Sequence, residues 1–221
     1  MSHLISAPPS LPPSIIYTSC YCEENVWLLA QHFQANVEVV RDWDIYVLFI
    51  SNENKTVALW RQKARPDVVV WDYHVILLLR RKCRDEKPPS CSSWIYDLDT
   101  TLGVPCEAGS YLSETFRSCP DMYTSRFRVI PALIFLDEFA SDRSHMLRPL
   151  PSSESGEGAT NIADHQLPVP SYPPICGPKA QSTGVLHNLM THFVDMTVEG
   201  FGEVVDLTAV LDLLITPVTT Y

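Results

Sequence analysis

A cysteine at position 22 lies where a thiol most readily becomes a nucleophile. After it, apolar side chains recur at the period of a helix, at Val26, Leu29, Ala30 and Phe33, which predicts a helix with Cys22 on its inward face. The positive end of the helix dipole would lie beside the sulfur, lower the thiol pKa and favour the thiolate that attacks a carbonyl carbon. Because a cysteine near a helix start is more often a small buried apolar residue, this chemistry depends on its partners.

Two later segments supply candidate partners. His74 lies in the β-branched and aromatic run 67–79, which predicts a strand buried on both faces, where a histidine needs a polar partner. The segment 94–100 predicts another strand, and the alternation of side chains along it places Asp97 and Asp99 on one face.

The geometry of a hairpin brings these partners together. The charged, proline-containing stretch 80–91 predicts a loop between the two strands. In a simple antiparallel hairpin centred on that loop, His74 lies opposite Asp97, with Asp99 as the diagonal neighbour. A bulge would shift this register, so the pattern selects the two aspartates more firmly than either one. Taken singly, His74 could be a buried core histidine, and Asp97 could be a turn or capping residue. Together with Cys22, they provide the nucleophile, the base and the orienting carboxylate of acyl transfer.

Several segments of the chain, in order, resemble the signature segments of the protein N-terminal glutamine amidohydrolase family. The segments that carry the resemblance are Cys20–Asn25 (CYCEEN), Val47–Glu53 (VLFISNE), Gln62–Pro66 (QKARP), Trp71–His74 (WDYH), Tyr96–Thr100 (YDLDT) and Phe139–Met146 (FASDRSHM), with a weaker echo near Gly200–Gly202. This ordered agreement spans most of the chain and is far more specific than a lone cysteine motif.

The resemblance implies an enzyme that deamidates the side chain of an N-terminal glutamine in a protein or peptide, giving glutamate and ammonia. It also implies a catalytic triad of Cys22, His74 and Asp97, with no metal and no cofactor. Family membership further implies a role in the N-degron branch of protein turnover, where the new glutamate becomes a substrate for arginylation.

The expected fold class is α+β, papain-like or transglutaminase-like. A helix that carries the thiol, packed on an antiparallel sheet that carries the histidine and the aspartate, is the arrangement of those proteins, and the chain order Cys, His, Asp agrees. Residues 1–14 contain four prolines and no continuous apolar segment, which predicts a disordered arm and not a signal peptide. Residues 15–221 are expected to form a single catalytic domain with a flexible Pro-, Ser- and Gly-rich insertion at about 149–184. Four further elements are predicted: a hairpin of 46–51 with 57–62, a strand at 127–130, and helices within 185–194 and 204–214.

Selectivity for an N-terminal residue also requires a group that binds the free ammonium of the substrate. Asp72 is the first candidate, because it lies two residues from His74 and would point to the same face of a strand. Glu23 and Glu24 are rivals, although a carboxylate at a helix start also has a purely structural use. Tyr21 could form a wall of the pocket or simply pack in the core.

Cysteine spacing and the remaining polar cluster favour no metal centre. Cys20 and Cys22 are separated by one residue, and the other five cysteines form no second pair at ligand spacing. Cys20 is expected to pack away from the site or to modulate it weakly. Arg143 and His145 are expected to anchor a loop through an ion pair, although they could also line the pocket.

Composition narrows the class of partner. The net charge of −10 and the absence of a Lys/Arg stripe argue against nucleic acid. The longest aliphatic run, Val75–Leu79, is far too short to span a bilayer. Seven cysteines, an odd number, indicate a reducing compartment, so the expected location is the cytoplasm and also the nucleus. The protein is expected to be a monomer. The alternatives are a cysteine peptidase, a transglutaminase-like acyltransferase, or a catalytically silent interaction module that presents the proline-rich segment 150–178 to partners.

Overall fold

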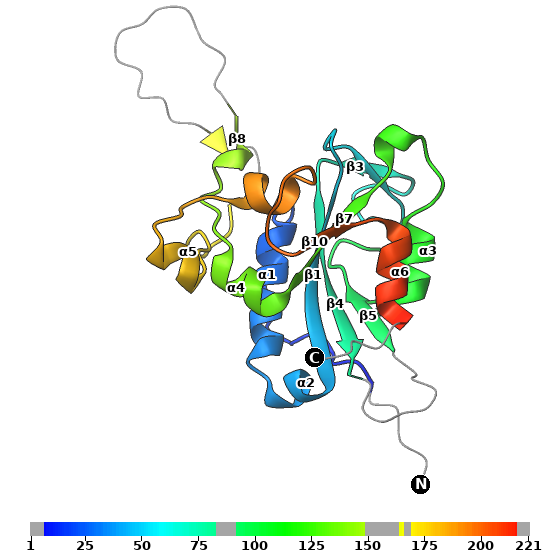
Figure 1. The fold of residues 1–221 in the computed structure, drawn as a ribbon, viewed down its shortest axis with the longest axis horizontal. Coiled ribbons are helices and arrows are strands. Elements are labelled where there is room, and N and C mark those ends of the chain that lie inside the picture. The colour runs from blue at the N-terminus through cyan, green and yellow to red at the C-terminus, as the bar shows by residue number, and fades with distance from the viewer. Residues whose placement is uncertain (1–6, 83–91, 149–163, 166–168, 216–221) are drawn as a thin grey trace, which may run out of the picture.

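A six-stranded antiparallel sheet forms the centre of the molecule (Figure 1). The computed structural model describes residues 7–82, 92–148, 164–165 and 169–215. The strands lie in the order β10-β7-β1-β4-β5-β6, and every neighbouring pair is antiparallel. Their bounds are β1 Trp43–Ser51, β4 His74–Arg81, β5 Ser93–Tyr96, β6 Cys106–Glu107, β7 Arg126–Pro131 and β10 Glu203–Val205. Helices with an antiparallel sheet confirm the predicted α+β class.

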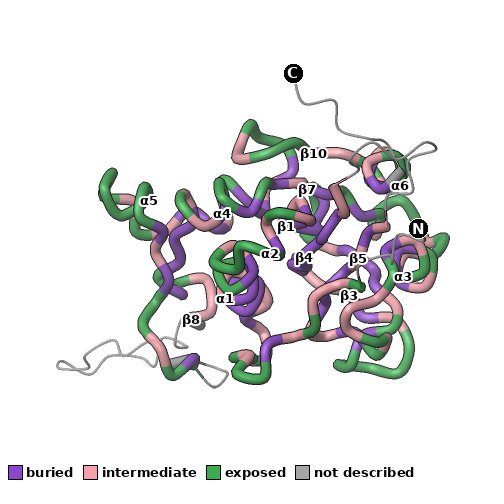
Figure 2. Tube along the Cα trace, turned by 90° about the horizontal axis from the view of Figure 1, so that it is seen from below, coloured by how far each residue is buried: buried purple, intermediate pink, exposed green. Residues whose placement is uncertain are grey.

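Two apolar layers cover the two faces of this sheet. Helices α1 (Cys22–Gln34) and α4 (Ala132–Glu138) pack on one face, and α3 (Ala108–Thr115) and α6 (Leu207–Ile215) lie on the other (Figure 1). Side chains of β4 alternate between the two layers, which explains why its sequence is almost continuously apolar. Figure 2 shows the buried positions gathered along β1, β4 and the inner side of α1.

The helix predicted from the spacing of apolar residues is α1, and it begins at the predicted nucleophile. Val26, Leu29, Ala30 and Phe33 are all buried against the sheet. The Asn25 amide secures the preceding chain, because it accepts from the Thr18 N–H and donates to the Thr18 carbonyl, each at 2.8 Å. The start of the helix is therefore fixed by apolar packing on β4 and by the two hydrogen bonds between Asn25 and Thr18.

The predicted strand over 67–79 is divided in two. β3 (Val69–Trp71) ends before Asp72, and β4 begins at His74. β3 pairs with β2 (Val57–Leu59) in a separate two-stranded sheet. His74 therefore stands at the first position of a central strand, directly after a change of chain direction.

The predicted hairpin of 46–51 with 57–62 is wrong. β1 pairs with β4 and β7, whereas β2 belongs to the other sheet. The Asn52 amide group explains the departure, because it donates to the carbonyls of Thr56, Met122 and Thr124 at 2.6–3.1 Å. The bonds to Met122 and Thr124 hold the chain after β1 against the loop at 122–124. The chain therefore does not fold back to pair with β1, and β2 forms part of the other sheet.

The remaining elements are short. The strand predicted at 127–130 is confirmed as β7, and the two helical patterns near the C-terminal end correspond to a π-helical turn, η3, and to α6. The other bounds are α2 Val37–Asp42, η1 Asp121–Tyr123, η2 Ser144–Met146, β8 Leu147–Arg148, β9 Asp164–His165, α5 Pro178–Ser182 and η3 Leu189–Val194. No described helix combines the length and apolar character that crossing a membrane requires.

Two segments predicted to be disordered or flexible lie partly within the described residues. In the arm, residues 1–6 fall outside them, whereas the Pro9 carbonyl accepts a hydrogen bond from the Tyr96 hydroxyl. In the segment 149–184, residues 149–163 and 166–168 fall outside them, and Ile175 and Ala180 are buried. The described parts of both segments therefore contact the fold.

Ser51 links β1 to the chain that enters β4, and its removal should be measurable. Its hydroxyl is fully buried and donates to the Asp72 carbonyl at 2.7 Å. We expect Ser51→Ala to lower the free energy of unfolding by about 1 kcal/mol in urea denaturation, because the hydrogen bond from the buried Ser51 hydroxyl is lost. The exposed Ser113→Ala in α3 is the matched control, with a change within about 0.5 kcal/mol. Equal effects of the two substitutions would contradict this role for Ser51.

Candidate active site

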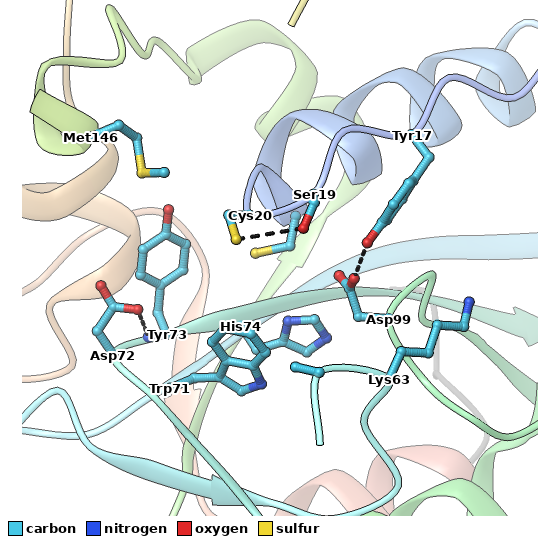
Figure 3. A pocket seen from close by; sticks show the side chains of 12 residues that line it. Tyr17, Ser19, Cys20, Lys63, Trp71, Asp72, Tyr73, His74, Asp99 and Met146 are labelled. Atoms are coloured by element: carbon cyan, nitrogen blue, oxygen red, sulfur yellow. Dashed lines mark hydrogen bonds between the residues drawn. The ribbon is translucent and has the colours of Figure 1, made fainter. Parts of the chain in front are cut away.

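A cavity of about 420 Å³ opens where the start of α1 meets the junction between β3 and β4. Cys22 and His74 both line it, together with Cys20, Asp72 and Asp99 (Figure 3). The structure therefore brings the predicted nucleophile and the predicted base to one cavity.

Asp97 lies behind His74, at the end of β5. His74 Nε2 is 2.9 Å from Asp97 Oδ1, and both side chains are almost completely buried. The carboxylate also accepts from Gln62 Nε2 at 3.1 Å, the Tyr111 hydroxyl at 2.8 Å and the Asp99 N–H at 2.9 Å. The aspartate is therefore fixed in place, and Nδ1 is the ring nitrogen that His74 can use toward the cavity.

The environment of the pair favours its charged form. Burial raises the pKa of the Asp97 carboxyl, but His74 and the surrounding donors more than offset this, so its pKa lies below the ordinary value. Burial lowers the pKa of the His74 imidazole, and the charge and hydrogen bond of Asp97 raise it above the ordinary value. His74 is thus well suited to hold a proton taken from a neighbouring group.

The predicted contact between His74 and Asp97 is confirmed, although the register behind it is wrong by two residues. β4 and β5 pair Leu77 with Tyr96, and continuing that register would place Asp99 opposite His74. β5 ends at Tyr96, so the chain turns and Asp97 reaches His74 from the diagonal position. The loop is asymmetric about the midpoint assumed for a simple hairpin.

The thiol of Cys22 differs from its prediction. Burial raises the pKa of the Cys22 thiol well above its usual range, and the carboxylates of Glu23 and Asp99 raise it further. A helix dipole contributes about 0.3–1 kcal/mol, whereas burial and a close like charge together can shift a pKa by more than about one unit. The prediction of a lowered thiol pKa is therefore wrong for the free protein, and the sulfur needs a base to remove its proton.

The three predicted substrate-binding residues occupy different environments. Asp72 is exposed on the cavity wall, and its Oδ1 accepts from the Tyr73 N–H at 2.9 Å. Tyr21 is fully buried with its ring 5.7 Å from the Arg143 guanidinium carbon. Glu23 is also fully buried and accepts from the Tyr73 hydroxyl at 3.1 Å.

Arg143 anchors a distant loop to the start of α1, as the sequence predicts. Its Nε and Nη2 donate to the two carboxylate oxygens of Glu24 at 2.8 Å each, and Nη2 also donates to the Tyr172 carbonyl. Bidentate contact of this kind is the strong form of an arginine–carboxylate pair. The neighbouring His145 instead lies 3.3 Å from the Tyr73 hydroxyl, so it belongs to the surroundings of the cavity.

Several site residues were missed or misplaced by sequence reasoning. Trp71 stacks on the His74 ring, with centroids 6.2 Å apart and planes at 17°. Tyr17 donates its hydroxyl to Asp99, closing one side of the cavity (Figure 3). Cys20 was expected to point elsewhere but lines the cavity, because its backbone has a φ of 65° and turns the chain just before α1. No pattern in the sequence marks the contact between Tyr17 and Asp99, which are 82 residues apart.

One described group of side chains could share a metal ion, namely His74, Asp97 and Asp99, whose donor atoms lie within 4.8 Å of one another. His74 and Asp97 are joined by a hydrogen bond, and Asp99 accepts from Tyr17. These atoms already satisfy one another in the arrangement that orients a catalytic imidazole.

Comparison with known proteins agrees with this geometry. The model of the N-terminal glutamine amidase family matches residues 17–214. Protein N-terminal glutamine amidohydrolase of Bos taurus is 38% identical over 207 residues, covering 90% of this chain and 87% of the relative. The protein of that name from Homo sapiens is 38% identical over 173 residues, with 71% and 80% covered, and the one from Drosophila mojavensis is 45% identical over 168 residues, with 72% and 71% covered. A match over nearly the whole chain and relatives this similar establish that the chain belongs to the N-terminal glutamine amidase family.

Proposed function

We propose that this protein hydrolyses the side-chain amide of an N-terminal glutamine, giving an N-terminal glutamate and ammonia. The observation that carries the proposal is the buried His74–Asp97 pair beside Cys22 in one cavity. This constellation performs acyl transfer in thiol hydrolases. Membership of the family and the names of its members support glutamine as the substrate.

In the first half-reaction the sulfur replaces ammonia. Because the Cys22 thiol is protonated, His74 Nδ1 takes its proton as sulfur attacks the carboxamide carbon. The C–N bond of the tetrahedral intermediate then breaks, and the imidazolium protonates the departing nitrogen. The products are ammonia and a thioester between Cys22 and the glutamyl side chain.

In the second half-reaction water releases the product. Neutral His74 accepts a proton from water as its oxygen attacks the thioester carbon. The C–S bond breaks, the Cys22 thiolate takes a proton from His74 to become the thiol again, and the N-terminal glutamate leaves. Asp97 holds the Nε2–H throughout, so that the imidazole keeps one tautomer and its charged form is stabilised.

The start of α1 can stabilise the oxyanion of both tetrahedral intermediates. The capping residue Tyr21 provides no side-chain hydrogen bond to the first turn, and the first N–H groups of a helix lack carbonyl partners within it. The Cys22 N–H is the donor best placed for an oxygen on a carbon bonded to its own sulfur. A donor of this type is typically worth about 3 kcal/mol in the transition state.

The substrate's free ammonium requires a negative group beside the thiol. Asp72 meets this need, because it is exposed to the cavity and its second carboxylate oxygen can face a ligand. Asp99 lies on another wall but already accepts from Tyr17. These two carboxylates outnumber Lys63, the one lysine among the described residues that line the cavity, and this excess of negative charge favours a cationic substrate.

The architecture supports assignment to the papain-like or transglutaminase-like type. The thiol lies at the start of α1, which packs on the antiparallel sheet, while the histidine begins β4 and the aspartate follows β5. The chain order of Cys22, His74 and Asp97 agrees with that type.

We also propose that the enzyme acts as a monomer, without metal or cofactor, in the cytoplasm and the nucleus. Its product would enter the N-degron branch of protein turnover, where an N-terminal glutamate is arginylated. The net charge of −10 supports action on protein termini and not on nucleic acid, and the seven cysteines support a reducing compartment.

The nucleophile is tested by comparing the two cysteines that line the cavity. We expect Cys22→Ala to reduce ammonia release from a Gln-starting peptide by on the order of 10⁴-fold or more, because the variant lacks the sulfur that forms the thioester. Cys20→Ala should retain measurable activity, since Cys20 precedes the helix. Circular dichroism should report a folded protein for both. Comparable turnover in the two variants would remove the central assignment.

The orienting carboxylate is tested by a second matched pair. Asp97→Asn should depress kcat by roughly 10⁴-fold, because an amide that donates to Nε2 selects the wrong tautomer. Asp99→Asn should cost less, since Asp99 accepts from Tyr17 and bonds the triad only through its backbone N–H. The reverse ranking would transfer the orienting role to Asp99.

Substrate selectivity separates an amidohydrolase from a peptidase, an acyltransferase or a silent module. N-terminal Gln should release ammonia, whereas N-terminal Asn, one methylene shorter, should react at least about a hundredfold more slowly because its carbonyl is displaced from sulfur. Acetyl-Gln and internal Gln should be inert. Asp72→Asn should raise KM and narrow the gap between free and acetylated peptides. Similar rates on internal Gln, or backbone cleavage, would defeat this proposal.

A further inference from the structure

Two consecutive glutamates at the start of α1 are completely buried but differ in their partners. Glu24 is held by two hydrogen bonds from the Arg143 guanidinium. Glu23 has no such cation, and its Oε1 has no hydrogen-bond partner among the described residues. A buried carboxylate is costly unless it is paired, and Glu23 lacks the cationic partner that Glu24 has.

The nearest candidate cation for Glu23 does not carry a charge near neutral pH. His145 Nε2 lies 3.7 Å from Glu23 Oε1. Burial lowers the pKa of the His145 imidazole to about 4, with a further contribution from His187, which stacks on it at 5.7 Å. The pair is therefore not an ion pair at pH 7, and burial raises the pKa of the Glu23 carboxyl to about 7.

Glu23 also contacts the nucleophile directly. Its Oε2 is 3.7 Å from the Cys22 sulfur and 3.1 Å from the Tyr73 hydroxyl. The titratable and charged groups around it are Cys22 and Glu24 in α1, Tyr73 just before β4, His74 at the first position of β4, Arg143 just before η2 and His145 in η2. Glu23 takes no step in the proposed hydrolysis, yet its carboxyl group lies within contact distance of the Cys22 sulfur.

We propose that Glu23 controls the transfer of the Cys22 proton to His74. As a neutral acid it can donate its O–H to the sulfur as negative charge develops there, and as a carboxylate it opposes that charge. A like charge at this distance raises a thiol pKa, and a hydrogen bond to the thiolate lowers it. The inference rests on the proposed function for its biological meaning, but the behaviour of the thiol can be measured without any substrate.

Alkylation of the free enzyme by iodoacetamide tests the proposal. The rate at Cys22 is followed from pH 5.5 to 10, and tandem mass spectrometry distinguishes modification at Cys22 from that at Cys20. Glu23→Gln keeps the shape and removes the charge, so the midpoint of the alkylation profile should fall by about one to three pH units. Glu24→Gln is the matched control, because it removes a neighbouring buried carboxylate that does not contact the sulfur, and its midpoint should stay close to that of the wild type.

Activity provides the second readout. In the wild type, kcat on a saturating Gln-starting peptide should rise with pH as His74 loses its proton and should decline with pH as Glu23, whose pKa is about 7, ionises. Glu23→Gln should abolish that decline. Saturation separates this effect from ionisation of the peptide's own terminus, which acts on KM.

Identical alkylation profiles for the wild type and Glu23→Gln, or an equal shift in Glu24→Gln, would overturn the proposal. If Glu23→Gln does not fold, Tyr73→Phe serves instead, because it removes the hydroxyl that stabilises the Glu23 carboxylate. That variant should alkylate faster at pH 7 to 8, and a profile that coincides with the wild type would also overturn the proposal. Loss of amidohydrolase activity on every peptide, with the alkylation shifts intact, would instead reject the proposed function alone.

Discussion

The hydrogen bond between His74 and Asp97 is almost completely buried, and several surrounding side chains serve to keep it paired. An isolated charge at that depth would cost several kcal/mol. Gln62 and Tyr111 fill the remaining acceptor positions of the carboxylate. The pair thereby fixes which imidazole nitrogen is left for Cys22, so the chemistry of the cavity depends on a bond that solvent does not reach.

The start of α1 shows how burial and charge divide the work between adjacent residues. Glu24 attaches the helix to Arg143, the residue just before η2, which is a structural role. Glu23 lies beside the sulfur without a cation. Desolvation outweighs the helix dipole at Cys22, so the free protein holds a thiol and the base must act during attack. A protonated resting thiol also limits reaction with oxidants, because the thiolate is the reactive form.

Local patterns predicted the parts of the site that depend on packing. The helical spacing of apolar residues located α1, and the apolar run after His74 located β4, because burial alone determines both. The contact between His74 and Asp97 was predicted from the hairpin, but nothing in the sequence links Gln62 or Tyr111 to Asp97. The hairpin after β1 was mispredicted because Asn52 bonds to a remote loop. The pKa of Cys22 was mispredicted because burial, the main cause of its rise, depends on tertiary structure.

The central claim is that Cys22 forms a covalent intermediate with the glutamyl side chain, and rapid acid quenching tests it most directly. Enzyme and a Gln-starting peptide are mixed, quenched from milliseconds to seconds through the first turnover, and digested for mass spectrometry. The account predicts an adduct on Cys22 equal to the substrate less ammonia, which hydroxylamine removes as expected of a thioester. Ammonia release with no adduct on Cys22 at any time, or with the adduct on Cys20, would contradict it.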